Sequence, residues 1–140
     1  MAGSINTPVA NATLDFLFGA GVNALAPATY YLAAFTVAPT NAGGGTEVPS
    51  ANGYARLALT NNATNFPAAA SREKENGVDW EFAASSAAWA SSAPIVAVAL
   101  MDASSGGNMK AWCDAAPAQA ITGAGQAPRI LAGQFTITVP

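Results

Sequence analysis

The chain has 140 residues, a length that suits a single domain, and it combines 51% hydrophobic residues with only 9% charged ones. Five basic residues are scattered among eight acidic ones, so the net charge of −3 offers no cluster of Lys and Arg for binding nucleic acid. No apolar run approaches the roughly 20 residues that cross a bilayer, and the low charge also argues against intrinsic disorder.

The N-terminal segment has the one clear helical pattern. Pro8 suits the first helical position and Thr7 can cap it, and apolar residues then recur at helical spacing as far as Gly19. We expect a helix over about 8–18, preceded by an arm of residues 1–7. The arm lacks the basic start and apolar stretch of a secretion signal, so we expect synthesis in a cytoplasm.

The next segments alternate between strand and loop patterns. Aromatic and branched residues at 29–37 predict a strand that is buried on both faces. A Gly-rich loop follows at 39–50, and residues 54–60 predict another strand. Residues 61–77 are polar, rich in Asn and contain the only charge cluster, at 72–75, so we expect a long surface loop there.

The second half of the chain predicts further strands. Val78, Trp80 and Phe82 alternate with acidic residues, which is typical of a half-buried strand. The apolar run 94–101 predicts a central strand, followed by a turn at 102–108 and a returning strand; residues 134–139 alternate again. We therefore expect a mainly β fold, an antiparallel β-sandwich (jelly-roll-like) or barrel, with residues 8–140 as its single domain.

The residue inventory argues against an enzyme. The chain has no histidine, which excludes Ser-His and Cys-His activation and any His-bound metal. Cys113 is the only cysteine and is expected to be structural. Asp79 and Glu81 lie on one face of a predicted strand and could bind a cation or act as acid and base, but a solvated strand face explains them better. We expect no cofactor, no metal and no catalytic residue.

Several segments, read in order, resemble a family of small structural proteins of tailed-bacteriophage particles, often labelled tail-fibre or hypothetical structural proteins. They are a Thr29–Thr36 strand after a helix, a Gly-rich segment 43–48 with 53–56, a turn at 100–108 with 111–112, and an alternating C-terminal strand at 132–139. The resemblance covers most of the chain. The motif residues that we single out for the fold are Gly45, Thr46, Glu47, Gly53, Tyr54, Arg56, Asp102, Gly106, Gly107, Asn108 and Trp112.

These motif residues have physical roles that concern folding more than binding. The glycines at 43–45 allow backbone turns that a β-carbon forbids. Glu47 and Arg56 are expected to form an ion pair beside the connecting loop, and a pair at the surface would contribute about 0–1 kcal/mol. Asp102 and Asn108 are expected to cap the hairpin turn through bonds from side chain to backbone.

The resemblance implies a component of the virion, made in the host cytoplasm. We expect a capsid cement or decoration protein on the outer surface of the capsid, where it would bind and bridge subunits of the major capsid protein with high avidity. A tail-fibre or baseplate component that binds tail proteins is the alternative, and a carbohydrate-binding module using Trp89 or Trp112 is a further one. We expect a homo-oligomer, a dimer or trimer, and possible contacts to capsid or neighbouring copies at Ile5, Asn6, Thr7, Arg72 and Lys74.

Overall fold

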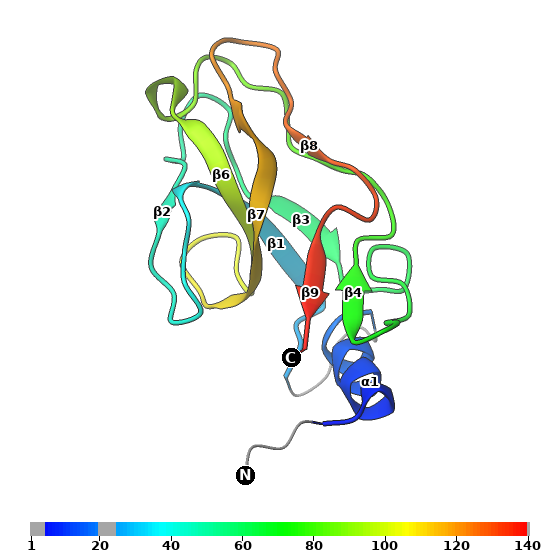
Figure 1. Cartoon of the computed structure of the whole chain (residues 1–140). Coiled ribbons are helices and arrows are strands. Elements are labelled where there is room, and N and C mark those ends of the chain that lie inside the picture. The colour runs from blue at the N-terminus through cyan, green and yellow to red at the C-terminus, as the bar shows by residue number, and fades with distance from the viewer. Residues whose placement is uncertain (1–4, 20–24, 140) are drawn as a thin grey trace.

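The computed structural model describes residues 5–19 and 25–139 (Figure 1). Its elements, in chain order, are α1 (Thr7–Leu17), β1 (Thr29–Val37), β2 (Thr46–Glu47), β3 (Leu57–Thr60), β4 (Glu73–Glu75), β5 (Trp80–Glu81), the short 3-10 helix η1 (Ala90–Ser92), β6 (Pro94–Met101), β7 (Met109–Ala120), β8 (Arg129–Ile130) and β9 (Thr136–Thr138). The fold is mainly β with one α-helix among the described residues, as the sequence predicts.

The largest sheet has the order β2-β1-β6-β7, with β3 also paired to β1. Two small sheets, β4-β9 and β5-β8, complete the fold, and all the named strand pairs are antiparallel. The run at 94–101 is indeed a central strand, because β6 pairs with β1 on one side and β7 on the other. The small sheets and the large sheet form two layers around one core, in agreement with a β-sandwich.

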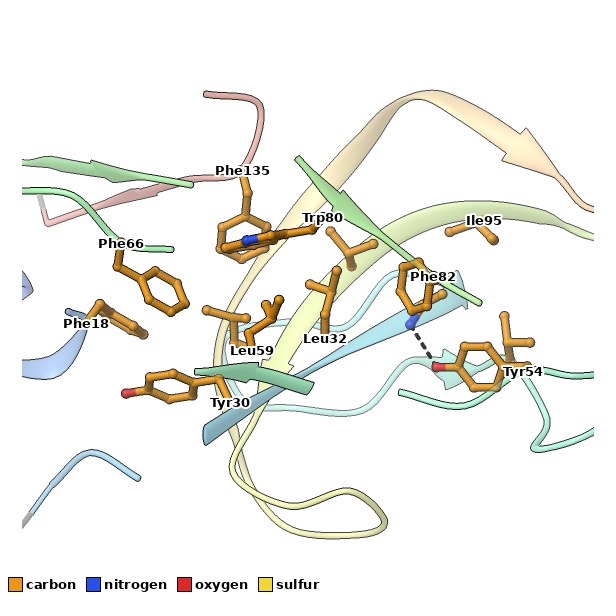
Figure 2. Packing of buried hydrophobic residues seen from close by; sticks show 14 of the residues in the cluster. Phe18, Tyr30, Leu32, Tyr54, Leu59, Phe66, Trp80, Phe82, Ile95 and Phe135 are labelled. Atoms are coloured by element: carbon orange, nitrogen blue, oxygen red, sulfur yellow. Dashed lines mark hydrogen bonds between the residues drawn. The ribbon is translucent and has the colours of Figure 1, made fainter. Parts of the chain in front are cut away.

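The main core lies between these layers and is rich in aromatic rings (Figure 2). It joins Leu32 and Leu100 of the large sheet to Trp80 of β5 and to Phe135 just before β9. Trp80 lies at the centre of this cluster, with its ring centroid 5.4 Å from that of Phe66 and 5.4 Å from that of Phe135. Rings therefore hold together segments that are far apart in the sequence.

The opposite face of the large sheet has a thinner cover. Ala33, Ala97 and Ala99 are fully buried there, and the partly buried side chains of Tyr31 and Trp112 pack against this second cluster. Alanine side chains are short, so the residues that cover them approach the backbone closely. The alanine-rich composition is explained in part by this thin second layer.

Helix α1 begins slightly earlier than the sequence predicts. Its N-cap is Asn6, whose side-chain oxygen accepts a hydrogen bond from Val9 N at 3.1 Å, so the prediction of Thr7 as the cap is wrong. Both residues can cap a helix, and Pro8 occupies the first turn either way. Asn6 and Thr7 therefore belong to the helix start, and residues 1–4 of the predicted arm lie outside the described residues.

The prediction of a long surface loop at 61–77 is also wrong. This segment contains β4 and buries Phe66, Asn61, Lys74 and Asn76, each with 2% or less of its surface exposed. Asn76 shows why a polar sequence can be buried: its amide donates to the carbonyls of Val78 and Leu131, both at 2.9 Å, and its oxygen accepts from Phe135 N at 2.8 Å. A buried polar group is tolerated when its hydrogen bonds are complete.

The hairpin between β6 and β7 forms where the sequence predicts it. Gly106 and Gly107 both have positive φ, at 60° and 72°. The returning strand, however, runs through to Ala120 and shifts its register against β6 between Ile95 and Ala97. No helix among residues 5–19 and 25–139 is long and apolar enough to cross a membrane.

Candidate functional site

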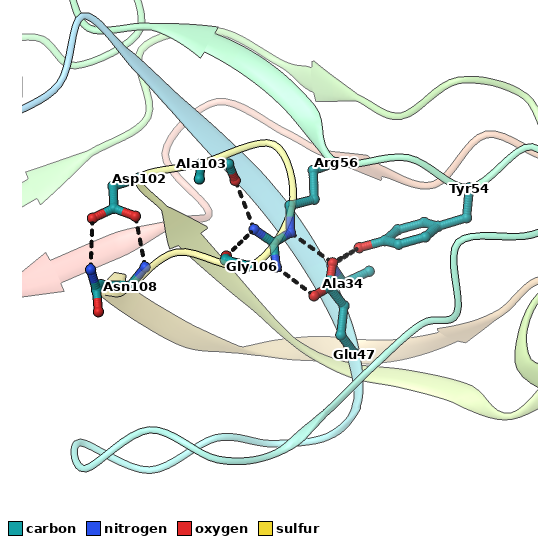
Figure 3. A network of polar contacts seen from close by, with 8 residues as sticks. All are labelled: Ala34, Glu47, Tyr54, Arg56, Asp102, Ala103, Gly106 and Asn108. Atoms are coloured by element: carbon teal, nitrogen blue, oxygen red, sulfur yellow. Dashed lines mark hydrogen bonds and ion pairs between the residues drawn. The ribbon is translucent and has the colours of Figure 1, made fainter.

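Two motif residues of the resemblance, Glu47 and Gly106, bind Arg56 directly (Figure 3). Its guanidinium donates to both carboxylate oxygens of Glu47, at 2.8 and 2.7 Å, and to the carbonyls of Ala103 and Gly106 at 2.7 and 2.8 Å. Glu47 also accepts a hydrogen bond from the Tyr54 hydroxyl at 2.9 Å. Arg56 thereby ties β2 and the segment before β3 to the turn between β6 and β7.

The predicted ion pair is confirmed, but it is less exposed than we expect of a surface pair. The side chain of Arg56 is 7% exposed and that of Glu47 is 27% exposed. Burial raises the pKa of Glu47, but hydrogen bonds from Arg56 and Tyr54 outweigh it and hold that pKa below its usual value. Burial raises the pKa of Tyr54 far above its usual value, and the hydroxyl in turn accepts a hydrogen bond from Ala34 N at 2.9 Å. The polar groups of Glu47, Tyr54 and Arg56 thus bond to one another and to nearby backbone groups, and these bonds fix the loops that carry them.

The hairpin turn is held by Asp102. Its carboxylate accepts from Asn108 N at 2.6 Å and from the Asn108 side-chain amide at 3.3 Å, and Lys110 lies 3.1 Å away. The backbone bond from Asn108 and the bond from Lys110 lower the pKa of Asp102 to about 2. Asp102 therefore caps the turn through its side chain, as expected. Asn108 supplies the donors instead, because its backbone N–H and its side-chain amide both donate to the Asp102 carboxylate.

The remaining motif residues also act on the backbone. Thr46 accepts a bond from Thr36 Oγ1 through its carbonyl, at 3.3 Å. Gly53 has a φ of 83° and lies against the backbone of Ala84 to Ser86. Trp112 is half-buried, and its indole N–H donates to Asn41 Oδ1 at 3.1 Å. Each of these contacts joins two segments, as expected of residues that specify a fold.

Gly45 and Gly44 offer a direct test of the glycine motif, because both have a φ of 82°. A β-carbon at Gly45 would lie 2.7 Å from Val37 O and 2.9 Å from Pro39 N, whereas one at Gly44 meets nothing within 4 Å. We expect Gly44→Ala to cost about 1–2 kcal/mol for its left-handed backbone, and Gly45→Ala to cost at least about 2 kcal/mol more because of the added clash. Urea unfolding followed by circular dichroism measures both; equal losses would contradict the steric explanation.

The two site carboxylates also predict an acid dependence. Their folded-state pKa values lie below the ordinary 4.5 of Glu and 3.8 of Asp, so the stability they contribute is present above those values and is lost as the pH falls toward about 2. We expect the free energy of unfolding to be level from pH 7 to about 5 and to fall as the pH drops through 4.5 toward about 2. Urea titrations at each pH measure this. The fall should be smaller in Asp102→Asn and Glu47→Gln, and an unchanged fall in both variants would contradict the assignment.

The five predicted contact residues differ in how far the structure exposes them. Ile5 is 43% exposed, and Asn6 and Thr7 are exposed at the start of α1. Lys74 is a correction: it is 2% exposed and its ammonium lies 2.8 Å from Asp15 Oδ1, so it cannot serve as a contact for another protein. Arg72 is half-buried, its Nε donates to Val139 O at 3.1 Å, and its Nη2 is buried without an acceptor in the described part of the chain.

The residues considered for a cation site, a reactive thiol and a sugar platform have other contacts in the described structure. Among the described residues no three metal-ligating side chains lie together. Asp79 and Glu81 are exposed and face Arg129 at 3.9 and 3.7 Å, as expected of a solvated strand face. Burial raises the pKa of Cys113 to about 11, which keeps its thiol protonated. Trp89 is 2% exposed and packs edge-on against Tyr54.

A cavity of about 650 Å³ lies between β7 and the segment around β8. Buried Phe82, Ile95 and Val98 line it together with the exposed ion pair of Glu81 and Arg129. Its lining includes Cys113 and the carboxylates of Glu81 and Asp114, and the raised pKa of Cys113 keeps the thiol protonated. The cavity therefore has the size of a ligand pocket, with apolar and charged side chains in its lining.

In a comparison with known proteins, no curated protein matches the chain. A family model described as podophage GP4 fiber I protein gp80 matches residues 4–138, which includes the Arg56 cluster, the Asp102 turn and the aromatic core. The chain therefore belongs to the podophage GP4 fiber I protein gp80 family and is a structural protein of a tailed-phage particle.

Proposed function

We propose that this chain is a subunit of a fibre attached to the tail of the phage particle. The observation that carries the proposal is the family match over residues 4–138, whose description is that of a podophage fibre protein. From the sequence alone we favour a capsid cement protein, but the small size and low charge behind that hypothesis suit a fibre subunit equally well. The family description therefore shifts the preference to the tail.

The geometry supports a scaffold role for the chain. Arg56 and Asp102 hold loops through bonds to backbone groups, and the large aromatic side chains of the core are buried. A subunit of this kind holds its surface in a fixed shape and associates through that surface with other proteins of the virion. Chemistry on a substrate is not needed for such a role.

The experiment that tests the proposal locates the chain in intact particles. Gold-labelled antibody against the purified chain, or cryo-electron microscopy of the particle, should place it on the tail. Quantitative mass spectrometry should find few copies relative to the major capsid protein. Density over the head shell between capsid subunits, with a copy number close to that of the capsid protein, would overturn the fibre proposal and support the cement protein instead.

A further inference from the structure

The cavity between β7 and β8 has two strand edges as its walls. β7 is the last strand of the five-stranded sheet, and β8 pairs only with β5 among the described strands. Residues 113–117 of β7 line the cavity on one side, and residues 127–131 around β8 line it on the other. No described strand runs between these two segments (Figure 1). We call this cavity of about 650 Å³ the slot.

The wall at β8 has unused backbone groups at Arg129. Residues of an antiparallel pair alternate between those that exchange backbone hydrogen bonds and those that do not. Phe82 N donates to Pro128 O at 3.0 Å, so the next pair, Glu81 and Arg129, does not exchange bonds. The N–H and C=O of Arg129 therefore point away from β5, and they bond to no other group among residues 5–19 and 25–139.

The same alternation leaves Asp114 unused on the wall at β7. Val48 N, just after β2, donates to Ala34 O at 2.9 Å, so the backbone of Ala34 faces β2 rather than β6. Its partner in β6, Val98, therefore bonds to Cys113 of β7, and the N–H and C=O of the next residue, Asp114, point outward. Each wall of the slot thus has a free donor and a free acceptor.

We propose that the slot binds an extended segment of another protein, which adds a strand between β7 and β8. Its backbone would bond to Asp114 on one side and to Arg129 on the other. Every second side chain of the added strand would then lie on the buried apolar lining, which consists of Phe82, Ile95 and Val98. Free strand edges attract further strands, and here the edges flank an apolar cavity of suitable size.

The charges of the slot favour a basic segment. Glu81 and Asp114 place two carboxylates in its lining, against the single guanidinium of Arg129. That guanidinium is already shared between Glu81 and Asp79, at 3.7 and 3.9 Å. A second copy of the chain suits the slot less well, because its four other basic residues have partners in their own domain: Arg56 with Glu47, Lys74 with Asp15, Lys110 with Asp102 and Arg72 with Val139. The occupant is therefore a different protein, with Lys or Arg beside branched apolar residues.

A labelled synthetic peptide tests the slot in the full chain. The probe is acetyl-Thr-Lys-Val-Thr-Val-Lys-Thr-amide, whose valines share one face of a strand and whose lysines share the other. Fluorescence anisotropy should show saturable binding that weakens as the salt concentration rises. Replacing both lysines by glutamates should weaken binding at least about tenfold, because it reverses the charge. Replacing the central threonine by proline should do the same, because it removes a backbone donor.

Asp114→Lys tests the charge from the side of the protein. Asp114 is exposed, so the fold should persist, with unchanged circular dichroism. The variant should lose most of its affinity for the lysine peptide and gain affinity for the glutamate peptide. Glu73→Lys is the matched control: it makes the same change of charge at an exposed residue of β4 outside the slot, and it should bind both peptides as the wild type does.

Hydrogen exchange gives an independent readout of the added strand. Bound lysine peptide should slow the exchange of the Asp114 and Arg129 amides, whereas the amide of Gly44, in an exposed loop, should not change. No binding at millimolar peptide, equal binding of the proline peptide, or equal effects of Asp114→Lys and Glu73→Lys would overturn the inference. Self-association of the chain that Asp114→Lys abolishes would also overturn it, and would assign the slot to a second copy. The inference holds whether the chain lies on the tail or the head.

Discussion

Replacing Trp80 by alanine is expected to lower the free energy of unfolding by about 3–5 kcal/mol, the usual cost of truncating a large buried aromatic residue. Trp80 is 2% exposed, and its ring packs against Phe66 and Phe135. Its indole N–H also donates to Asn65 Oδ1 at 3.2 Å. The truncation would leave a cavity where three segments meet, and it would leave the Asn65 oxygen without this donor. Thermal unfolding followed by circular dichroism should show a midpoint lower by roughly 10 °C or more.

Trp112 provides the matched control for this prediction. It is also a tryptophan with a bonded indole N–H, but it is half-buried and covers the alanine face of the sheet. We expect Trp112→Ala to cost about half as much as Trp80→Ala, because truncating it removes less contact and leaves a surface dent rather than a cavity. If Trp112→Ala proved the more damaging of the two, the aromatic cluster around Trp80 would not be the main source of stability.

Replacing Arg56 by alanine is expected to cost about 3–4 kcal/mol, because a partly buried carboxylate loses its countercharge and two backbone carbonyls lose the donor that Arg56 provides. Those acceptors are Glu47, Ala103 and Gly106. Arg56→Lys should recover less than half of the loss, since an ammonium cannot make the paired bonds to Glu47 and reach both carbonyls as well. Urea unfolding at pH 7 measures each variant.

Arg129 is the control for charge alone. Its guanidinium lies 3.9 and 3.7 Å from two exposed carboxylates and is itself 52% exposed. Arg129→Ala removes the same side chain and should change the free energy of unfolding by less than about 1 kcal/mol. A loss at Arg56 as small as the loss at Arg129 would mean that the cluster in Figure 3 contributes little to the fold.

The sequence predicts best those features that depend on neighbouring residues. The strands at 29–37 and 94–101 form where they are expected, because an apolar run of strand length has few other stable conformations in a small domain. The turn at 102–108 forms because its glycines and Asp102 provide both the positive φ and the bonds that a tight turn needs. The predicted cap of α1, Thr7, is one residue away from the observed cap, Asn6, since both residue types can serve.

Features that join distant segments were predicted only in part. The resemblance led to the pairing of Glu47 with Arg56, but not to the bonds from Arg56 to carbonyls 47 and 50 positions further along the chain. The charge cluster at 72–75 predicts a surface loop for Lys74, and the structure buries it. Its partner Asp15 lies 59 positions away, and no local pattern links the two.

The sequence by itself excluded chemistry that needs histidine and determined the segments able to form strands, turns and a helix, because both depend on residue types and their immediate spacing. The tertiary structure decided which polar residues are buried and which apolar ones stay exposed. It placed Lys74 inside and left Val9 and Phe16 half-exposed on α1. The physical reason is that burial and charge pairing depend on segments that meet only after the chain has folded.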